Sequence, residues 1–173
     1  REVVPPPVGV GDERDADARA GHLDEGGAQR LDAAPAAVAA GEPQVFAEVA
    51  QAAEVIFLSL PGGKQVNAVC AEIAAHARPG TTVVDLSTTA VADARTAAAL
   101  LADKGIAFAD APVARTRQAA VDGTLSIMVG ASEALFARIQ PLLAHMGSDV
   151  TLCGDVGCGQ VVKLINNTLL FAQ

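Results

Sequence analysis

The chain has 173 residues, of which 51% are hydrophobic and only 3% aromatic, with neither Trp nor Tyr. This length suits a single domain whose core must be packed from Ala, Val, Leu and Ile, a composition that favours α/β architecture over an aromatic-rich β-sandwich. Twenty acidic residues against twelve basic ones give a formal net charge of −8, which disfavours binding to nucleic acid, because such binding requires positive charge against the phosphates.

The chain offers no candidate membrane segment. Its longest nearly continuous apolar run, residues 55–60, is six residues long, far short of the roughly 20 that a membrane-spanning helix needs. No basic segment followed by an apolar stretch opens the chain, so we expect a cytoplasmic protein. Cys153 and Cys158 lack the second Cys pair or nearby His of a zinc site, and we expect all three cysteines, with Cys70, to be reduced core residues and no metal to be bound.

Residues 1–43 differ in composition from the rest of the chain. They carry nine acidic and four basic residues, several prolines and glycines, and almost no aliphatic run. The pair Gly9 and Gly11 lacks both the third glycine and the preceding strand of a dinucleotide-binding fingerprint. We interpret this segment as disordered or as translated from a shifted reading frame.

From residue 45 onward, short aliphatic strands alternate with alanine-rich helical windows. A continuous apolar run predicts a first strand over 55–60, ended by Pro-Gly-Gly and followed by a helix over 66–74. The same reasoning predicts, in chain order, a strand over 82–86, a helix over 91–104, strands over 106–109 and 125–129, a helix over 133–146 and a strand over 150–152. Such alternation is typical of βαβ units, so we expect a parallel sheet flanked by helices.

The last predicted element is a helix over 161–173 that is apolar on nearly every side and carries no stop signal. A helix of this kind is normally buried between layers or against a partner. We therefore expect its continuation, or a second subunit, to cover it.

Open parallel α/β sheets bind ligands beyond the carboxyl ends of their strands, so the loops there are the first candidate site. The segment 154–159 supplies three glycines at the start of the last helix, where backbone N–H groups and a partial positive charge are free. Lys163 and Asn167 are four residues apart and share one face of that helix. A lysine is usually solvated, but the apolar neighbours of Lys163 favour desolvation, which lowers the pKa of an amine towards the range of a general acid.

A second candidate is the loop that follows the strand over 106–109. Arg115 and Arg117 present guanidinium groups, which hold carboxylate or sulfonate in a bidentate fork and so predict an anionic substrate. The alternative is an exposed pair of arginines on a polar turn. Asp110 precedes Ala-Pro, where an aspartate more often fixes the turn than takes part in chemistry.

Three segments together resemble the β-hydroxyacid dehydrogenase family, which includes 3-hydroxyisobutyrate dehydrogenase, tartronate semialdehyde reductase and, more distantly, 6-phosphogluconate dehydrogenase. Residues 110–113, Asp-Ala-Pro-Val, are similar to the start of the family's substrate loop, and residues 123–130 to the strand after it. Residues 154–167 are similar to its catalytic motif of two glycines, Lys and Asn-Asn. The order and spacing match over about residues 44–173.

The resemblance implies a Rossmann-type domain that binds NAD or NADP, with Leu60, Pro61 and Thr88 where the family contacts the cofactor. It also implies that Lys163 is the catalytic proton donor and acceptor and that Asn167 holds the substrate. In this family, hydride passes between the nicotinamide and the carbonyl carbon while the lysine supplies a proton to the developing alkoxide.

The chain departs from the family pattern in its substrate loop and at both ends. Where the family usually has Ser-Gly-Gly, this chain has Ala114, Arg115 and Thr116, a version similar to the sulfolactaldehyde reductase branch, in which arginine faces an anionic head group. We therefore expect Arg115 and Thr116 to bind the substrate. The family's Gly-rich pyrophosphate loop is not found in residues 1–43, and we expect its helical second domain to be missing after Gln173.

The expected organisation is an anomalous segment over 1–43, a partial dinucleotide-binding domain over 44–156, and the start of an interdomain helix over 157–173. The expected function is NAD(P)-dependent transfer of hydride between nicotinamide and a small anionic β-hydroxyacid or aldehyde. We expect the fragment itself to be inactive and the full-length protein to be a homo-oligomer. The alternative is a catalytically inactive, dehydrogenase-like interaction module, against which the presence of Lys163 argues.

Overall fold

The computed structural model describes residues 43–172, and the predictions for residues 1–42 and for Gln173 lie outside this range. The helices in this range are α1 (Pro43–Ala52), α2 (Gly63–His76), α3 (Val91–Ala102), α4 (Arg117–Val121), α5 (Glu133–Leu143) and α6 (Cys158–Phe171). The strands are β1 (Val55–Leu58), β2 (Thr82–Asp85), β3 (Ala107–Asp110), β4 (Val113–Ala114), β5 (Leu125–Gly130) and β6 (Gly147–Gly154). Each helix and strand that the sequence predicts after residue 54 is present, and α1, β4 and α4 are additional.

The strands form one six-stranded sheet with the order β1-β2-β3-β5-β4, in which β6 pairs with β5. β1, β2 and β3 are parallel, and their register places Leu58, Asp85 and Asp110 side by side at the carboxyl ends of the three strands. The Rossmann-like α/β class is thus confirmed. The loops that leave these three strand ends lie at one edge of the sheet, where parallel α/β folds bind ligands.

β5 is the departure from the predicted parallel order. It runs antiparallel to both β3 and β4, while β6 lies parallel to it. No crossover helix follows β3, because the chain continues through Ala111 and Pro112 into β4. The helix between β4 and β5, α4, has only five residues. A parallel return needs a crossover of about a dozen residues or more, so this short connection favours antiparallel pairing.

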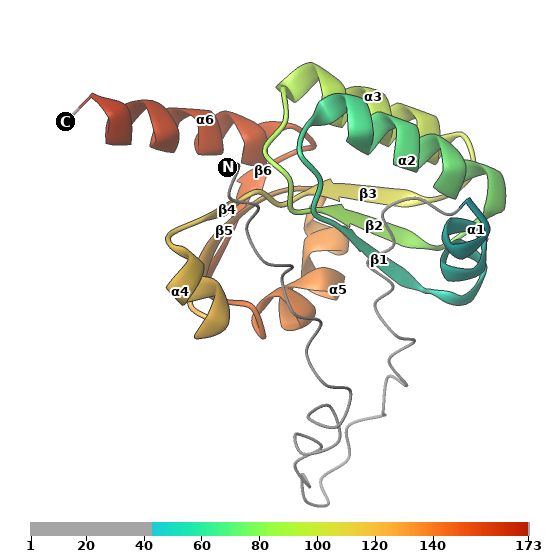
Figure 1. Ribbon diagram of the computed structural model, residues 1–173, viewed down its shortest axis with the longest axis horizontal. Helices are drawn as coiled ribbons and strands as arrows, with labels where there is room; N and C mark the ends of the chain where they lie inside the picture. The colour runs from blue at the N-terminus through green and yellow to red at the C-terminus, as the bar shows by residue number, and fades with distance from the viewer. Residues whose placement is uncertain (1–42, 173) are drawn as a thin grey trace, which may run out of the picture. The chain divides into compact units, whose positions relative to one another are not determined.

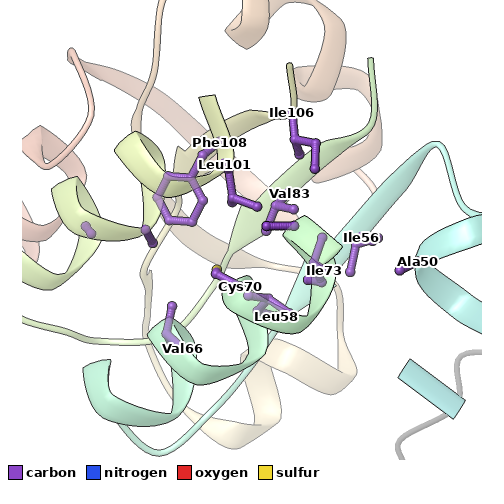
Figure 2. Packing of buried hydrophobic residues seen from close by; sticks show 13 residues of the cluster. Ala50, Ile56, Leu58, Val66, Cys70, Ile73, Val83, Leu101, Ile106 and Phe108 are labelled. Carbon is purple, nitrogen blue, oxygen red and sulfur yellow. The ribbon is translucent and has the colours of Figure 1, made fainter. Parts of the chain in front are cut away.

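Helices cover both faces of the sheet: α2 and α3 lie over one face and α5 over the other (Figure 1). The core under α2 and α3 is aliphatic, with Val66, Val83 and Leu101 fully buried (Figure 2). Under α5, Ile127 and Leu143 are buried to the same extent. Each layer therefore hides its apolar face from water, which holds the strand ends in fixed positions.

The cysteines divide into two environments, and all three are free thiols. Cys70 belongs to α2 and is fully buried in the core, and its burial, with a smaller contribution from the Asp85 carboxylate, raises the pKa of the thiol to about 12. Cys153 and Cys158 are half-buried. The prediction of a core position is therefore confirmed for Cys70 and wrong for the other two.

The last helix, α6, leaves the end of β6 and runs away from α2 and α3 (Figure 1). Its large apolar side chains are 37–63% exposed: Val161, Val162, Leu164, Ile165, Leu169 and Leu170. Within the described residues this surface is thus uncovered, where the sequence predicted a layer or a partner over it. None of the helices between Pro43 and Phe171 is both long enough and apolar enough to span a bilayer.

Candidate active site at the carboxyl ends of the strands

The loops after β1 and β2 are joined by hydrogen bonds through Ser87. The Leu60 N–H donates to Ser87 Oγ at 2.8 Å, and the Ser87 N–H donates to Asp85 Oδ1 at 3.0 Å. Pro61 and Thr88 are exposed beside this junction. The structure therefore brings together Leu60, Pro61 and Thr88, the three residues that the family resemblance implies as cofactor contacts.

Asp110, at the end of β3, holds the start of α6. Its side chain is fully buried, with Oδ1 accepting from the Gly157 N–H at 2.6 Å and Oδ2 accepting from the Gln160 N–H at 2.8 Å. Burial raises the pKa of Asp110, while the hydrogen bonds from the backbone of Gly157, Gln160 and Gly159 oppose that rise. Asp110 is structural, as the sequence suggested. Besides preceding the Ala-Pro turn, it fixes the start of a helix, at Gly157, that lies 47 residues later in the chain.

Two glycines allow α6 to approach the strands this closely. Gly157 has a φ of +96°, in the left-handed region that other residues adopt only with strain. A Cβ on Gly159 would collide with the Met128 carbonyl oxygen and lie 2.9 Å from Asp110 Oδ2. Gly157 and Gly159 thus serve the seating of α6 on β3 and β5.

Gln160 joins α6 to the loop after β2, and sequence reasoning missed it. Its fully buried side chain donates from Nε2 to the Ser87 carbonyl at 2.8 Å and accepts at Oε1 from the Thr89 N–H at 3.0 Å. No local pattern identifies such a residue, because its partners are more than 70 residues away. The only available signal was its place between the motif glycine and Lys163.

Lys163 and Asn167 lie on α6, one turn apart and both partly buried. Burial lowers the pKa of the Lys163 ammonium from its ordinary value of 10.5, in the direction expected for an amine among apolar neighbours. The first turn of α6 is anchored to Asp110, and Lys163 lies about one turn beyond Gln160 on the same helix.

Arg115 and Thr116 are engaged within their own loop. The exposed Arg115 donates from Nη1 to the Thr124 carbonyl at 2.9 Å and to Ser148 Oγ at 3.4 Å. Thr116 is the N-cap of α4, because its Oγ1 accepts from the Ala119 N–H at 3.3 Å. No hydrogen bond within residues 43–172 links this loop to Lys163, so the two halves of the predicted substrate site stay unconnected here.

Arg115 also has a strained backbone, with a φ of +89°. We expect the Arg115→Gly variant to be more stable than Arg115→Ala by about 1 kcal/mol, because only glycine adopts this conformation without a Cβ penalty. Both variants lose the bond to Thr124, so the comparison isolates the strain. Urea unfolding of the two variants measures the difference, and an alanine variant of equal or greater stability would contradict it.

Asp85 is expected to make the fold less stable as the pH rises above the ordinary carboxyl range. Its buried Oδ2 has no hydrogen-bond partner within the described residues. Burial raises the pKa of Asp85 above 3.8, opposed by hydrogen bonds from Ser87 and reinforced by the nearby Asp110 carboxylate. The folded state therefore binds the proton more tightly, and the free energy of unfolding falls as the pH rises from 3.8 through the folded pKa. Urea unfolding across this window should give a shallower slope for Asp85→Asn, and equal slopes would reject the assignment.

Comparison with known proteins adds a family match. Residues 15–154 match the NAD binding domain of 6-phosphogluconate dehydrogenase, a match that begins inside the compositionally distinct segment 1–43. Among curated relatives, 2-(hydroxymethyl)glutarate dehydrogenase of Eubacterium barkeri is 42% identical over 126 residues, which are 71% of this chain and 42% of that protein. A Mycobacterium bovis protein named "Probable 3-hydroxyisobutyrate dehydrogenase" is 37% identical over 160 residues, which are 89% of this chain and 53% of that protein.

A solved structure agrees with these matches. The 3-hydroxyisobutyrate dehydrogenase of Mycobacterium tuberculosis, determined with L-serine, superposes with a TM-score of 0.70 at 37% identity, over 72% of this chain and 43% of that one. The chain spans about half the length of the curated relatives described above.

Proposed function

The chain belongs to the NAD-binding domain family of 6-phosphogluconate dehydrogenase and the β-hydroxyacid dehydrogenases. From this premise we propose that it functions in an oxidoreductase that acts on a small anionic β-hydroxyacid or aldehyde. The observation that carries the proposal is the position of Lys163. This partly buried amine lies one turn beyond the junction at which Asp110 and Gln160 bind α6 to the strand ends.

The described residues fit the nicotinamide end of a dinucleotide. Leu60 and Pro61 offer an apolar surface, and Thr88 offers an exposed hydroxyl beside it, at the carboxyl ends of parallel strands. These residues would hold the nicotinamide through contact with its ring and amide. When bound, the nicotinamide supplies the hydride or accepts it.

Lys163 is proposed to move the proton that accompanies the hydride. In the reducing direction its ammonium donates from Nζ to the oxygen that gains negative charge as the carbonyl is reduced, and in the oxidising direction the neutral amine removes that proton. A lowered pKa favours both roles, because a group transfers protons best when its pKa lies near the working pH. Asn167, one turn further along the same face, is proposed to orient the substrate by hydrogen bonds from its amide.

Arg115 and Thr116 are proposed to bind the substrate's anionic group. Both hydrogen bonds of Arg115 within the described residues come from Nη1, so the remaining donors of this exposed guanidinium are available to a carboxylate or sulfonate. Thr116 Oγ1 is used as an acceptor in the helix cap and keeps its hydroxyl proton for a second bond to the anion.

We expect Arg115→Ala to raise KM for anionic aldehydes by about 10- to 100-fold, the value of one or two hydrogen bonds to a charged group. KM for neutral aldehydes should change little. Steady-state assays with matched anionic and neutral substrates measure the effect, with Arg78→Ala, which removes an exposed arginine after α2, as the control. Equal effects on the KM of both substrate classes would show that Arg115 is an exposed surface arginine with no role in binding the anion.

The proposal as a whole is tested by an assay of hydride transfer. A full-length enzyme containing this chain is mixed with NAD or NADP and a panel of short 3-hydroxyacids and their aldehydes, and the absorbance of the reduced nicotinamide is followed. Turnover that depends on an anionic substrate supports the proposal. Binding of the dinucleotide without turnover of any panel member would instead favour a catalytically inactive interaction module.

A further inference from the structure

Gln160 stands out because its amide is fully buried and both of its polar atoms are hydrogen-bonded to the backbone. Its Nε2 donates to the carbonyl of Ser87 at 2.8 Å, and its Oε1 accepts from the N–H of Thr89 at 3.0 Å. The side chain thus binds the main chain on both sides of Thr88, as a neighbouring strand would. Thr88 itself stays exposed at the proposed nicotinamide surface.

The bonds of Gln160 continue into the rest of the site. Ser87, which Gln160 holds by its carbonyl, accepts from the Leu60 N–H at its Oγ, so the loop after β1 depends on the position of Ser87. On the helix side, the backbone N–H of Gln160 donates to Asp110 Oδ2 at the end of β3. One residue therefore connects the ends of three parallel strands to the helix that carries Lys163.

Packing alone does not require an amide at this position. An apolar side chain of similar length fills the same volume, and it leaves the Ser87 carbonyl and the Thr89 N–H without partners. The amide supplies one donor and one acceptor whose spacing matches those two groups. It thereby fixes both the distance and the orientation of the loop relative to α6, because two hydrogen bonds to one planar group resist rotation as well as translation.

We propose that Gln160 is a positioning residue, which sets the loops of Leu60 and Thr88 against the helix of Lys163 and so aligns hydride transfer with proton transfer. The proposal rests on the function proposed above. It differs from a purely structural role in one respect. Loss of the amide should affect the alignment of reacting groups more than the binding of the substrate, whose proposed contacts lie at Arg115, Thr116 and Asn167.

Hydrogen exchange on the 173-residue chain tests the coupling without any need for activity. In Gln160→Met, the Thr89 amide loses its acceptor, and we expect it to exchange about tenfold faster or more. The Leu60 amide keeps its own acceptor, Ser87 Oγ, so faster exchange there shows that the loop after β1 has loosened as well. The control is Gln140→Met on the exposed face of α5, which should change neither amide. Unchanged exchange at Leu60 would overturn the proposal.

Kinetics of the full-length enzyme supply the second test. We expect Gln160→Met to lower kcat by about 10- to 100-fold, the cost of misplacing reacting groups by a fraction of an ångström or more, with KM for the anionic substrate nearly unchanged. Gln160→Glu keeps the acceptor for the Thr89 N–H and loses the donor to the Ser87 carbonyl, so its kcat should lie between those of the wild type and Gln160→Met. A kcat within twofold of the wild type, or an equal change in kcat and KM, would overturn the proposal.

The two tests separate the possible failures. If the wild-type enzyme turns over no substrate, the proposed function is wrong, and the exchange experiment still decides whether Gln160 couples the two loops to α6. If Gln160→Met does not fold, Gln160→Glu provides both measurements, and an exchange rate at Leu60 equal to that of the wild type then rejects the coupling.

Discussion

Replacing Lys163 with methionine is expected to lower the turnover of a full-length enzyme containing this chain by about 10²- to 10⁴-fold, the usual contribution of general acid–base catalysis. Methionine keeps the length and apolar stem of lysine, so α6 should remain seated, since Asp110 and Gln160 hold its first turn. The affinity for NAD or NADP should change little, because the proposed cofactor contacts belong to the loops after β1 and β2. Steady-state rates and a titration of the dinucleotide measure the two quantities separately.

The control for this experiment is Lys104→Met, which removes an exposed lysine after α3 and should leave turnover unchanged. The pH profile adds an independent check. Because burial lowers the pKa of Lys163, reduction by the wild type should slow as the pH rises through that pKa, and the limb should vanish in the methionine variant. If Lys163→Met kept more than about a tenth of the wild-type rate, the assignment of Lys163 as the acid–base group would be wrong.

The second large effect is expected at Asp110, whose replacement by alanine should lower the free energy of unfolding by about 2–5 kcal/mol. The substitution removes the acceptors of the Gly157 and Gln160 N–H groups and leaves these donors buried without partners. The total stability of a domain is only about 5–15 kcal/mol, so a loss of this size is easily measured. Urea denaturation followed by circular dichroism gives the value.

Asp110→Asn is the intermediate variant, because the asparagine amide keeps one acceptor oxygen. It should lose less stability than Asp110→Ala. Asp103→Ala, at an exposed aspartate after α3, is the control and should stay within about 0.5 kcal/mol of the wild type. If Asp110→Ala unfolded at the same urea concentration as the wild type, the carboxylate would not be what holds α6 on the sheet.

The helices and strands were largely predictable, because their signals are local. The run 55–60 contains β1, and the helix that follows stops at Arg-Pro-Gly, as such residues require. β4 and the direction of β5 were not predictable in this way. Two residues are too few to show a period, and strand direction depends on which neighbour a strand meets after its turn rather than on its own sequence.

The candidate site was predictable in its location and only partly in its construction. The rule that ligands bind at the carboxyl ends of parallel strands identified the loops after β1 and β2. The parts that hold these loops together, Ser87, Gln160 and the helix-fixing role of Asp110, depend on contacts between distant segments. Their residue types also occur at ordinary turns and helix starts, so nothing in the sequence distinguishes them. The positive φ of Arg115 was equally invisible, since it belongs to the backbone conformation of one loop.

The distances along the chain that Gln160 and Asp110 bridge bear on the order in which the protein assembles. Gln160 is hydrogen-bonded to residues that lie 71 and 73 positions away from it in the chain. Asp110 is hydrogen-bonded to residues that lie 47 and 50 positions away. Strands β1 and β2 need a much shorter closure, as between Val55 and Thr82. Since longer closures cost more chain entropy, we expect the parallel strands to form first and α6 to dock last. Mild denaturant should then release α6, and Lys163 with it, while the parallel strands and their covering helices remain folded.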